Sequence, residues 1–271
     1  MKMKYPLATA TWDSAEYQAL QDVISGGMFT MGPKVAQFEK DVASYIGSKY
    51  AVMVNSGSSA NLLMVAALIY TKNSKLQLKP GDEVIVPAVS WSTTYYPLYQ
   101  YGLKLKFVDI DLHTLNYDLD QLSAAVSSNT KAIMAVNLLG NPNDFSKIYQ
   151  IIGNRQIVLI EDNCESLGAQ FEGKMAGTFG VMGAFSSFFS HHISTMEGGL
   201  IVTDNEELYH VLVSLRAHGW TRNLPKENHV CGTKSDDPFE ASFRFVLPGY
   251  NVRPLEMSGL LELSRLKSAL S

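Results

Sequence analysis

The stretch QIVLIED, residues 156–162, contains an unbroken apolar run that ends in two acids. A strand buried on both faces of a sheet has such a continuous apolar run. Similar runs lie at 49–55, 82–87, 105–111, 131–137, 183–189 and 198–204. Helical-period segments lie between several of them, at 60–71, 119–127 and 206–217. This alternation predicts an α/β fold with a mainly parallel seven-stranded sheet between helices.

The residues that follow these runs are polar and rich in glycine. They read NSGSSAN (55–61), PAVSWSTTYY (87–96), NLLGNP (137–142), EDNCES (161–166) and SHHISTMEGG (190–199). In open α/β sheets, ligands bind at the carboxyl ends of the strands. The sequence therefore predicts a binding site that these segments form together. Residues 221–242 are also polar, and we expect them to form a long surface loop near that site.

Three parts of these segments have two interpretations each from local sequence alone. Gly57 and Ser58 open a helix, and they either cradle a phosphate or form an ordinary strand-to-helix turn. Asp162 either pairs with a protonated ring nitrogen or caps the turn that follows it. Trp91 either stacks on a planar ring or belongs to the core.

The composition argues against several classes of protein. The chain has 271 residues, a net charge of -4 and no long basic run, which disfavours nucleic acid or an anionic membrane surface as a partner. Cys164 and Cys231 are its two cysteines and stand far apart, so we expect no disulfide, no metal site and a reducing cytoplasm. No apolar stretch has the length of a signal peptide or of a membrane span.

The segment SSFFSHHISTMEGG, 186–199, resembles the DegT/DnrJ/EryC1/StrS family of sugar aminotransferases, which are fold-type-I pyridoxal-phosphate enzymes. In that family a Ser-Phe run leads to a lysine that binds the cofactor covalently, and a Thr-x-Glu-Gly-Gly tail follows. Here His191 stands at the lysine position, and no lysine lies between Lys174 and Lys226. The resemblance continues along the chain in MFTMGPKVAQFE (28–39), NSGSSANLL (55–63), KPGDEVIVPAVSWSTTYYP (79–97), KFVDID (106–111), EDNCESLGA (161–169), RAHGWTRN (216–223) and PGYNVRPLE (248–256).

The resemblance implies the large domain of such an enzyme and a role for each site residue. The cofactor is pyridoxal phosphate or its amine form, pyridoxamine phosphate. It would be bound noncovalently by Gly57, Ser58, Trp91, Asp162, Glu165 and Ser186. His191 would be the catalytic acid and base. The substrate or the amino donor would contact His218, Arg222, Asn251 and Arg253. The sugar nucleotide of a partner subunit would be reached by Gly27, Met28, Phe29 and Thr30, so we expect a homodimer with shared active sites.

The exchange of lysine for histidine has chemical consequences. Histidine cannot hold the cofactor covalently, but it can both accept and return a proton near neutral pH. The resemblance therefore implies removal of the C3 hydroxyl from a GDP-linked 4-keto-6-deoxy sugar. L-Glutamate would restore the amine form of the cofactor. The product would be a 3,6-dideoxy-4-keto sugar of the kind used in O-antigen biosynthesis.

Three alternatives remain open at this point. A plain sugar aminotransferase would need the missing lysine. An iron–sulfur-dependent 3-dehydratase would need more than the two cysteines present. The third alternative is a catalytically silent fragment that still binds cofactor or partners, because the resemblance fades near Gly259. Under every one of these alternatives, the resemblance implies a cofactor-binding large domain with its N-terminal arm at 1–258. A divergent helical tail, 259–271, would stand where the family's smaller C-terminal domain begins.

Overall fold

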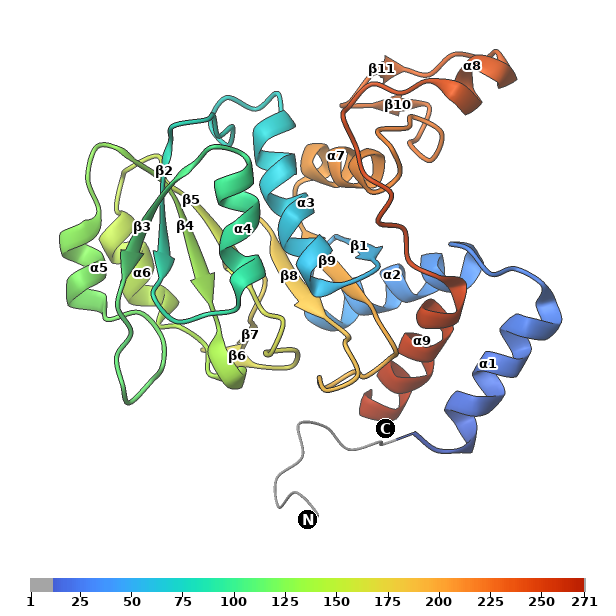
Figure 1. Ribbon diagram of the computed structural model, residues 1–271, viewed down its shortest axis with the longest axis horizontal. Helices are drawn as coiled ribbons and strands as arrows, with labels where there is room; N and C mark the ends of the chain where they lie inside the picture. The colour runs from blue at the N-terminus through green and yellow to red at the C-terminus, as the bar shows by residue number, and fades with distance from the viewer. Residues whose placement is uncertain (1–11, 271) are drawn as a thin grey trace.

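Seven strands form the central sheet of the protein. The fold comes from a computed structural model, which describes residues 12–270. The strands are β1 (Tyr50–Val54), β2 (Glu83–Pro87), β3 (Lys104–Val108), β4 (Thr130–Val136), β5 (Val158–Asp162), β8 (Gly183–Ser186) and β9 (Gly199–Thr203). Their order across the sheet is β1-β9-β8-β5-β4-β2-β3 (Figure 1). Every strand expected from an apolar run is present, and the predicted fold class is confirmed.

One strand of the sheet runs against the others. β9 is antiparallel to both of its neighbours, β1 and β8, whereas the remaining pairs are parallel. A parallel pair needs a crossover connection, which usually contains a helix. The connection from β8 to β9, residues 187–198, contains no helix, so the chain turns back beside β8. This reversal leaves residues 187–198 at the carboxyl edge of the parallel strands.

Helices cover both faces of the sheet (Figure 1). They are α1 (Ser14–Gly26), α2 (Pro33–Ile46), α3 (Gly57–Tyr70), α4 (Ser92–Gln100), α5 (Leu119–Ala125), α6 (Phe145–Ile152), α7 (Glu206–Arg216), α8 (Pro238–Phe243) and α9 (Glu256–Leu270). Shorter elements are the 3-10 turn Leu138–Gly140 and the strands β6 (Gln170–Phe171), β7 (Lys174–Met175), β10 (Glu227–Asn228) and β11 (Gly232–Thr233). Within residues 12–270, the helices lack the length and apolar character needed to span a bilayer.

The two faces of the sheet are visible in the packing of β1. Val52 and Val54 belong to the apolar cluster that contains residues of α3 and α7, whereas Ala51 and Met53 belong to the cluster around α2. Successive side chains of a strand point to opposite faces, so one short strand supports both layers. Helix α3 begins directly after β1 and is buried along most of its length. Its first turn therefore lies at the carboxyl edge of the sheet.

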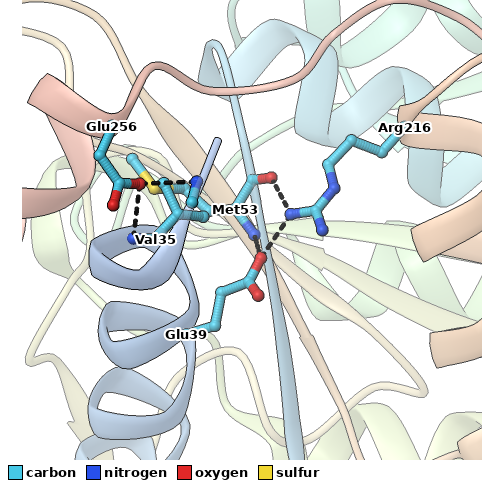
Figure 2. A network of polar contacts seen from close by, with 6 residues as sticks. Val35, Glu39, Met53, Arg216 and Glu256 are labelled. Atoms are coloured by element: carbon cyan, nitrogen blue, oxygen red, sulfur yellow. Dashed lines mark hydrogen bonds and ion pairs between the residues drawn. The ribbon is translucent and has the colours of Figure 1, made fainter. Parts of the chain in front are cut away.

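Polar contacts join helices α2 and α7 to β1 (Figure 2). The Arg216 guanidinium in α7 donates to the Glu39 carboxylate in α2 and, at 2.7 Å, to the Met53 carbonyl oxygen. The same Glu39 carboxylate accepts the Met53 N–H at 2.8 Å. In Figure 2 the carboxylate of Glu256, the first residue of α9, lies over the first turn of α2 and accepts the Val35 N–H at 3.2 Å.

The segment 221–242 differs from its prediction as a long loop near the site. It contains the β10–β11 hairpin and helix α8. The Lys72 ammonium, just past the end of α3, donates to the carbonyl oxygens of His229 and Val230 at 3.2 and 2.9 Å. The hairpin is thus fixed beside the carboxyl end of α3, away from the first turn of that helix (Figure 1). These hydrogen bonds attach the polar segment to the end of α3, and composition does not reveal them.

The segment expected to be a divergent tail is part of a longer helix. Helix α9 runs without a break from Glu256 to Leu270, so the boundary predicted after residue 258 falls inside it. It packs against α1 and α2, as Figure 1 shows. Leu263 and Leu266 are buried in the cluster that includes α2. The division of the chain into domains remains a prediction.

Candidate active site

A cavity of about 370 Å³ lies at the carboxyl edge of the sheet. It is bounded by the first turns of α3 and α4 and by the chain segments that follow β4, β5 and β8. Every residue predicted for the cofactor or for catalysis lines it: Gly57, Ser58, Trp91, Asp162, Glu165, Ser186 and His191. These residues are spread over 135 positions, from 57 to 191, and only the sheet brings them together.

The first turn of α3 forms one end of the cavity. The Ser56 hydroxyl caps the helix by accepting the Ser59 N–H at 3.1 Å, and the Ser58 hydroxyl lies 2.8 Å from the Thr93 hydroxyl. A Cβ on Gly57 would lie 2.6 Å from the Ser186 Cβ, so the close approach of β8 requires glycine there. The first N–H groups of a helix have no partner within the helix and attract anions. This end of the cavity suits a phosphate.

Asp162 supplies the buried acid of the cavity. Its carboxylate accepts hydrogen bonds from the Asn61 amide at 2.8 Å, the Thr94 hydroxyl at 2.7 Å and the Cys164 N–H at 3.2 Å. The side chain is buried, and none of the ion pairs in the described part of the chain involves it. A buried carboxylate without a cation favours a positively charged ligand group.

The adjacent acid, Glu161, has a different environment. Its carboxylate faces away from the cavity and accepts the N–H groups of Gly177 and Gly180 at 2.7 and 2.6 Å. Burial raises the pKa of Glu161 to about 7, and these backbone donors act in the opposite direction. Neighbouring strand residues point to opposite sides of a sheet. The two acids that end β5 therefore have different surroundings, and of the two only Asp162 lines the cavity.

Trp91 lies at the mouth of the cavity. It is the residue before α4, and its side chain is 72% exposed although it lines the cavity. The interpretation of Trp91 as a core residue is therefore wrong. A large exposed aromatic ring at a cavity rim offers a face on which a planar ligand can stack.

His191 lies in the connection between β8 and β9. Its backbone N–H donates to the Phe188 carbonyl oxygen at 2.9 Å, and its ring meets the Phe188 ring edge-on at 6.0 Å between centroids. Burial lowers the pKa of His191 below its usual 6.5, and the charge of Glu165 opposes this effect. The imidazole is therefore mainly neutral at neutral pH and can accept a proton.

Glu165 is held at the cavity by a turn of unusual backbone geometry. Its carboxylate accepts the Leu139 N–H at 3.0 Å. Leu139 has a φ of 52°, in the left-handed region that residues other than glycine seldom adopt. Such strain is often found at functional sites. The turn follows β4 and carries Leu138, which also lines the cavity.

The sequence did not single out several residues that line the cavity. They are Ser56, Asn61, Ser90, Thr93, Val136, Asn137, Leu138, Cys164, Phe188, Ser190 and Glu197. Most of them lie in or beside the polar segments that follow the strands, so the position of those segments was the available signal. Which member of each segment faces the cavity depends on backbone geometry that the sequence does not reveal.

The residues predicted to meet substrate form a separate cluster around Trp220. The guanidinium carbons of Arg222 and Arg253 lie 5.6 and 5.7 Å from the centre of the Trp220 ring, and the His218 ring meets its edge at 5.1 Å. The Arg253 Nε donates to the Asn251 side-chain oxygen at 3.0 Å. None of the predicted members of this cluster lines the His191 cavity.

The predicted segment 27–30 also lies outside the cavity. Gly27 ends α1 with a φ of 68°, and the Phe29 carbonyl oxygen accepts the Glu256 N–H at 3.1 Å. Thr30 forms an isolated bridge with Leu255. Met28 and Phe29 are 49% and 53% exposed, so apolar side chains are presented to solvent beside the start of α9. Within one chain, the structure brings together neither this segment nor the Trp220 cluster with His191.

The two cysteines have different surroundings. Cys164 lines the cavity, and burial raises the pKa of its thiol well above the usual value. Cys231 lies in the β10–β11 hairpin, where its N–H donates to the Asn228 side-chain oxygen at 2.9 Å. Both thiols are free. Among the described residues, no group of three or more His, Cys, Asp or Glu side chains could hold a metal ion.

The cavity fits the cofactor that the resemblance implies. Its helix end suits the phosphate, and the exposed ring of Trp91 suits a planar pyridine ring. The side chains that bond to the Asp162 carboxylate are neutral, and a protonated ring nitrogen would give it a positively charged partner. No lysine lines the cavity, so nothing there can bind the cofactor covalently through an amine.

Comparisons with known proteins agree with this geometry. Residues 11–270 match the DegT/DnrJ/EryC1/StrS aminotransferase family. The chain is 67% identical to the GDP-4-keto-6-deoxy-D-mannose 3-dehydratase of Escherichia coli O55:H7, over 98% of this chain and 68% of that protein. It is 65% identical to the enzyme of the same name from Yersinia pseudotuberculosis, over 98% of this chain and 67% of that protein.

Solved structures show the same relation. The E. coli GDP-4-keto-6-deoxy-D-mannose-3-dehydratase with bound hydrated PLP superimposes with a TM-score of 0.96 at 66% identity, covering 98% of this chain and 68% of that one. A GDP-4-keto-6-deoxymannose-3-dehydratase with a trapped PLP–glutamate geminal diamine gives the same TM-score, identity and coverage. The family match spans all of the described residues, 12–270. The chain therefore belongs to the DegT/DnrJ/EryC1/StrS aminotransferase family.

Proposed function

We propose that this chain removes the C3 hydroxyl of GDP-4-keto-6-deoxy-D-mannose with the help of noncovalently bound pyridoxamine phosphate. The product is a GDP-linked 3,6-dideoxy-4-keto sugar. The observation that carries this proposal is the half-buried imidazole of His191 in the same cavity as Asp162 and Trp91, where the family has a lysine. Relatives at 67% and 65% identity, which bear the corresponding enzyme name, support it.

The residues of the cavity divide the work of binding. When bound, the cofactor supplies an amine that condenses with the sugar's C4 ketone and a ring that withdraws electrons. Asp162 would keep the proton on the ring nitrogen, because its buried carboxylate would gain a cation there. The first turn of α3 and Ser186 would hold the phosphate, and Trp91 would stack on the ring. These contacts replace the covalent tether that a lysine would provide.

His191 moves the proton. As a neutral base it accepts a proton from the C4′ carbon beside the cofactor's amine. As an acid it then returns a proton to the departing C3 oxygen, which leaves as water. One imidazole can serve both steps because its charge changes near neutral pH. Hydrolysis would then release the 3,6-dideoxy-4-keto sugar and ammonia and leave the cofactor as its aldehyde, pyridoxal phosphate. L-Glutamate would convert the aldehyde back to the amine form and would itself become 2-oxoglutarate.

The active enzyme is a homodimer in this proposal. The Trp220 cluster and segment 27–30 do not line the His191 cavity of their own chain. In the dimer they would bind substrate at the cavity of the partner subunit. Apolar side chains at Met28, Phe29 and Leu255 are 49%, 53% and 52% exposed, as expected of a surface that another subunit covers. Light scattering should return a dimer. A fully active monomer would contradict this arrangement.

With both cysteines free, we place the reaction in the reducing cytoplasm.

A turnover assay tests the proposed reaction. Protein would be mixed with pyridoxal phosphate, L-glutamate and GDP-4-keto-6-deoxy-D-mannose. Ammonia, 2-oxoglutarate and a 3-deoxy sugar would support the dehydratase, whereas an aminated sugar would indicate an aminotransferase. A cofactor spectrum without turnover would indicate a silent binding protein. H191N should lower turnover by at least about 100-fold while the cofactor still binds.

A second variant tests the position of His191. H191K should form a covalent link to the cofactor that borohydride reduction traps, because the amine replaces the imidazole at the same place. H192K serves as the matched control, because the adjacent His192 is exposed and does not line the cavity. Trapping on H192K rather than H191K would show that the two positions have been assigned wrongly.

A further inference from the structure

The connection that carries His191, residues 187–198 and here called the His191 loop, is closed at its base by hydrogen bonds. The Ser187 N–H donates to the Gly198 carbonyl oxygen at 3.0 Å, and the Thr195 N–H donates to the Ser187 carbonyl oxygen at 2.9 Å. The Thr195 hydroxyl also donates to the Ser187 carbonyl oxygen, at 3.0 Å. These bonds join the two ends of the loop, so their geometry sets the direction in which His191 projects.

Helix α9 contacts this loop at two points. The Ser258 hydroxyl donates to the Glu197 carbonyl oxygen at 2.9 Å, and the Glu262 carboxyl accepts the Ser187 hydroxyl. Ser258 and Glu262 are four residues apart, which places them on one face of the helix. The helix therefore contacts both ends of the loop, one at Ser187 and the other at Glu197.

The contact at Glu262 is fully buried. Glu262 is 0% exposed and Ser187 is 2% exposed. A Cβ on Gly198 would lie 2.6 Å from a Glu262 carboxyl oxygen, so glycine at the end of the loop leaves the space that the carboxyl occupies. The second carboxyl oxygen of Glu262 has no hydrogen-bond partner among the described residues. No cation pairs with Glu262 in the described ion pairs.

Burial also determines the charge of this carboxyl. It raises the pKa of Glu262 to about 8, and the hydrogen bond from the Ser187 hydroxyl acts in the other direction. A carboxyl that is neutral at pH 7 can be buried without an ion pair. Burying a polar group on a helix face costs free energy of folding. An apolar residue at position 262 would fill the same space without that cost. The contact to Ser187 is the feature that an apolar residue would not reproduce.

We propose that Glu262 is a positioning residue for His191: by accepting the Ser187 hydroxyl it fixes the base of the His191 loop to α9. Ser258 assists at the other end of the loop. Helix α9 is thereby a part of the catalytic apparatus, although it contributes no residue to the lining of the cavity. The role in turnover rests on the proposed function, whereas the effect on the loop does not.

Three variants test this proposal in the full chain. E262Q keeps the accepting oxygen and the volume, E262A removes both, and L266A weakens α9 elsewhere, because Leu266 packs in the α2 cluster. Hydrogen exchange of residues 187–198 would be measured by mass spectrometry, each variant being held equally far below its own Tm. We expect exchange in E262A to be at least about tenfold faster than in wild type, and exchange in E262Q and L266A to match wild type.

Turnover supplies the second readout. E262A should lower kcat by about 10- to 100-fold and leave the KM for the sugar nucleotide unchanged, because a displaced base slows the chemical step rather than binding. E262Q should restore most of kcat. Should E262A not fold, S258A gives a milder version of the same test, because it removes one hydrogen bond and little volume.

The outcomes separate this proposal from the proposed function. Equal loop exchange in E262A and L266A, or a loss of kcat in E262Q as large as in E262A, overturns the positioning role. If H191N abolishes turnover while E262A retains wild-type loop exchange, the proposed function stands and the positioning role fails. Faster loop exchange in E262A together with full turnover in H191N would mean that the loop is fixed by α9 but that His191 is not the acid–base group.

Discussion

At the residue scale, the chemistry depends on the protonation state of one imidazole. Burial lowers the pKa of His191, whereas the negative charges of Glu165 and Asp162 act to raise it and the neighbouring His192 acts to lower it. A base must be unprotonated to accept a proton, so the lowered pKa extends the active form to more acidic solutions. The residues around His191 therefore set its pKa through burial and through their charges.

This balance predicts the pH dependence of turnover. The acidic limb of kcat/KM should lie below pH 6.5, the usual pKa of histidine. E165Q should move the limb to lower pH, because the charge that favours imidazolium is lost. H192N should move it in the opposite direction. A steady-state pH profile of the three proteins checks these signs, and a limb above 6.5 in wild type would contradict the environment described for His191.

A second prediction at this scale concerns stability. The pKa of Glu262 is raised by burial from 4.5 to about 8, so the folded state holds a proton that the unfolded state releases. This contribution to the free energy of unfolding is fully present below pH 4.5 and is lost as the pH rises through about 8. Urea unfolding across that range should show a shallower decline in E262Q than in wild type. Parallel curves for the two proteins would rule out the raised pKa.

At the element scale, the first turn of α3 joins fold and function. Small residues there allow β8 to come close, and the same turn presents backbone N–H groups to the cavity. Three polar side chains of this helix end also line the cavity: Ser56, Ser58 and Asn61. A substitution that displaces the helix end should therefore affect ligand binding and stability together.

G57A tests this element. The added methyl would lie 2.6 Å from the Ser186 Cβ and 2.8 Å from the Cys164 sulfur, so the helix end has to shift. We expect cofactor affinity to fall at least about tenfold and the free energy of unfolding to fall by about 1–3 kcal/mol. G26A is the matched control, because no atom lies within 4 Å of its new methyl. Titration of pyridoxal phosphate and urea unfolding measure the two effects, and equal behaviour of the two variants would contradict the close packing at Gly57.

At the scale of the whole molecule, polar contacts connect parts of the chain that are distant in sequence. Arg216 and Glu39 are separated by 177 positions and meet behind β1 (Figure 2). The Glu256 carboxylate accepts the N–H groups of Gly32 and Lys34 at 2.7 and 2.6 Å, so the start of α9 caps α2. These contacts join α2 to α7, which packs on the opposite face of the sheet, and to the start of α9.

The Arg216–Glu39 pair gives a prediction at this scale. The Arg216 side chain is 5% exposed, so R216M leaves the Glu39 carboxylate without its cation in a largely buried place. The free energy of unfolding should fall by about 3–5 kcal/mol, and the double variant R216M/E39M should lose less than R216M alone. Urea unfolding of both variants measures the difference. A double variant that loses as much as R216M or more would contradict this account of the pair.

Much of this protein was determined by the sequence alone. Apolar runs predicted each strand of the sheet, and the polar segments after those runs predicted the edge at which the cavity lies. His191 at the lysine position predicted the chemistry that the relatives' names support. Patterns of this kind are legible because burial and turn formation depend on residues that are close together in the chain.

Only the tertiary structure decided which side chains meet. It turned Glu161 toward the N–H groups of Gly177 and Gly180, reversed β9, and separated the Trp220 cluster from His191 within one chain. It also placed Glu262 of α9 against Ser187, 75 positions away. Contacts of this kind arise from the packing of whole elements against one another. The free energy of such packing is shared among distant residues, so no local pattern in the sequence records it.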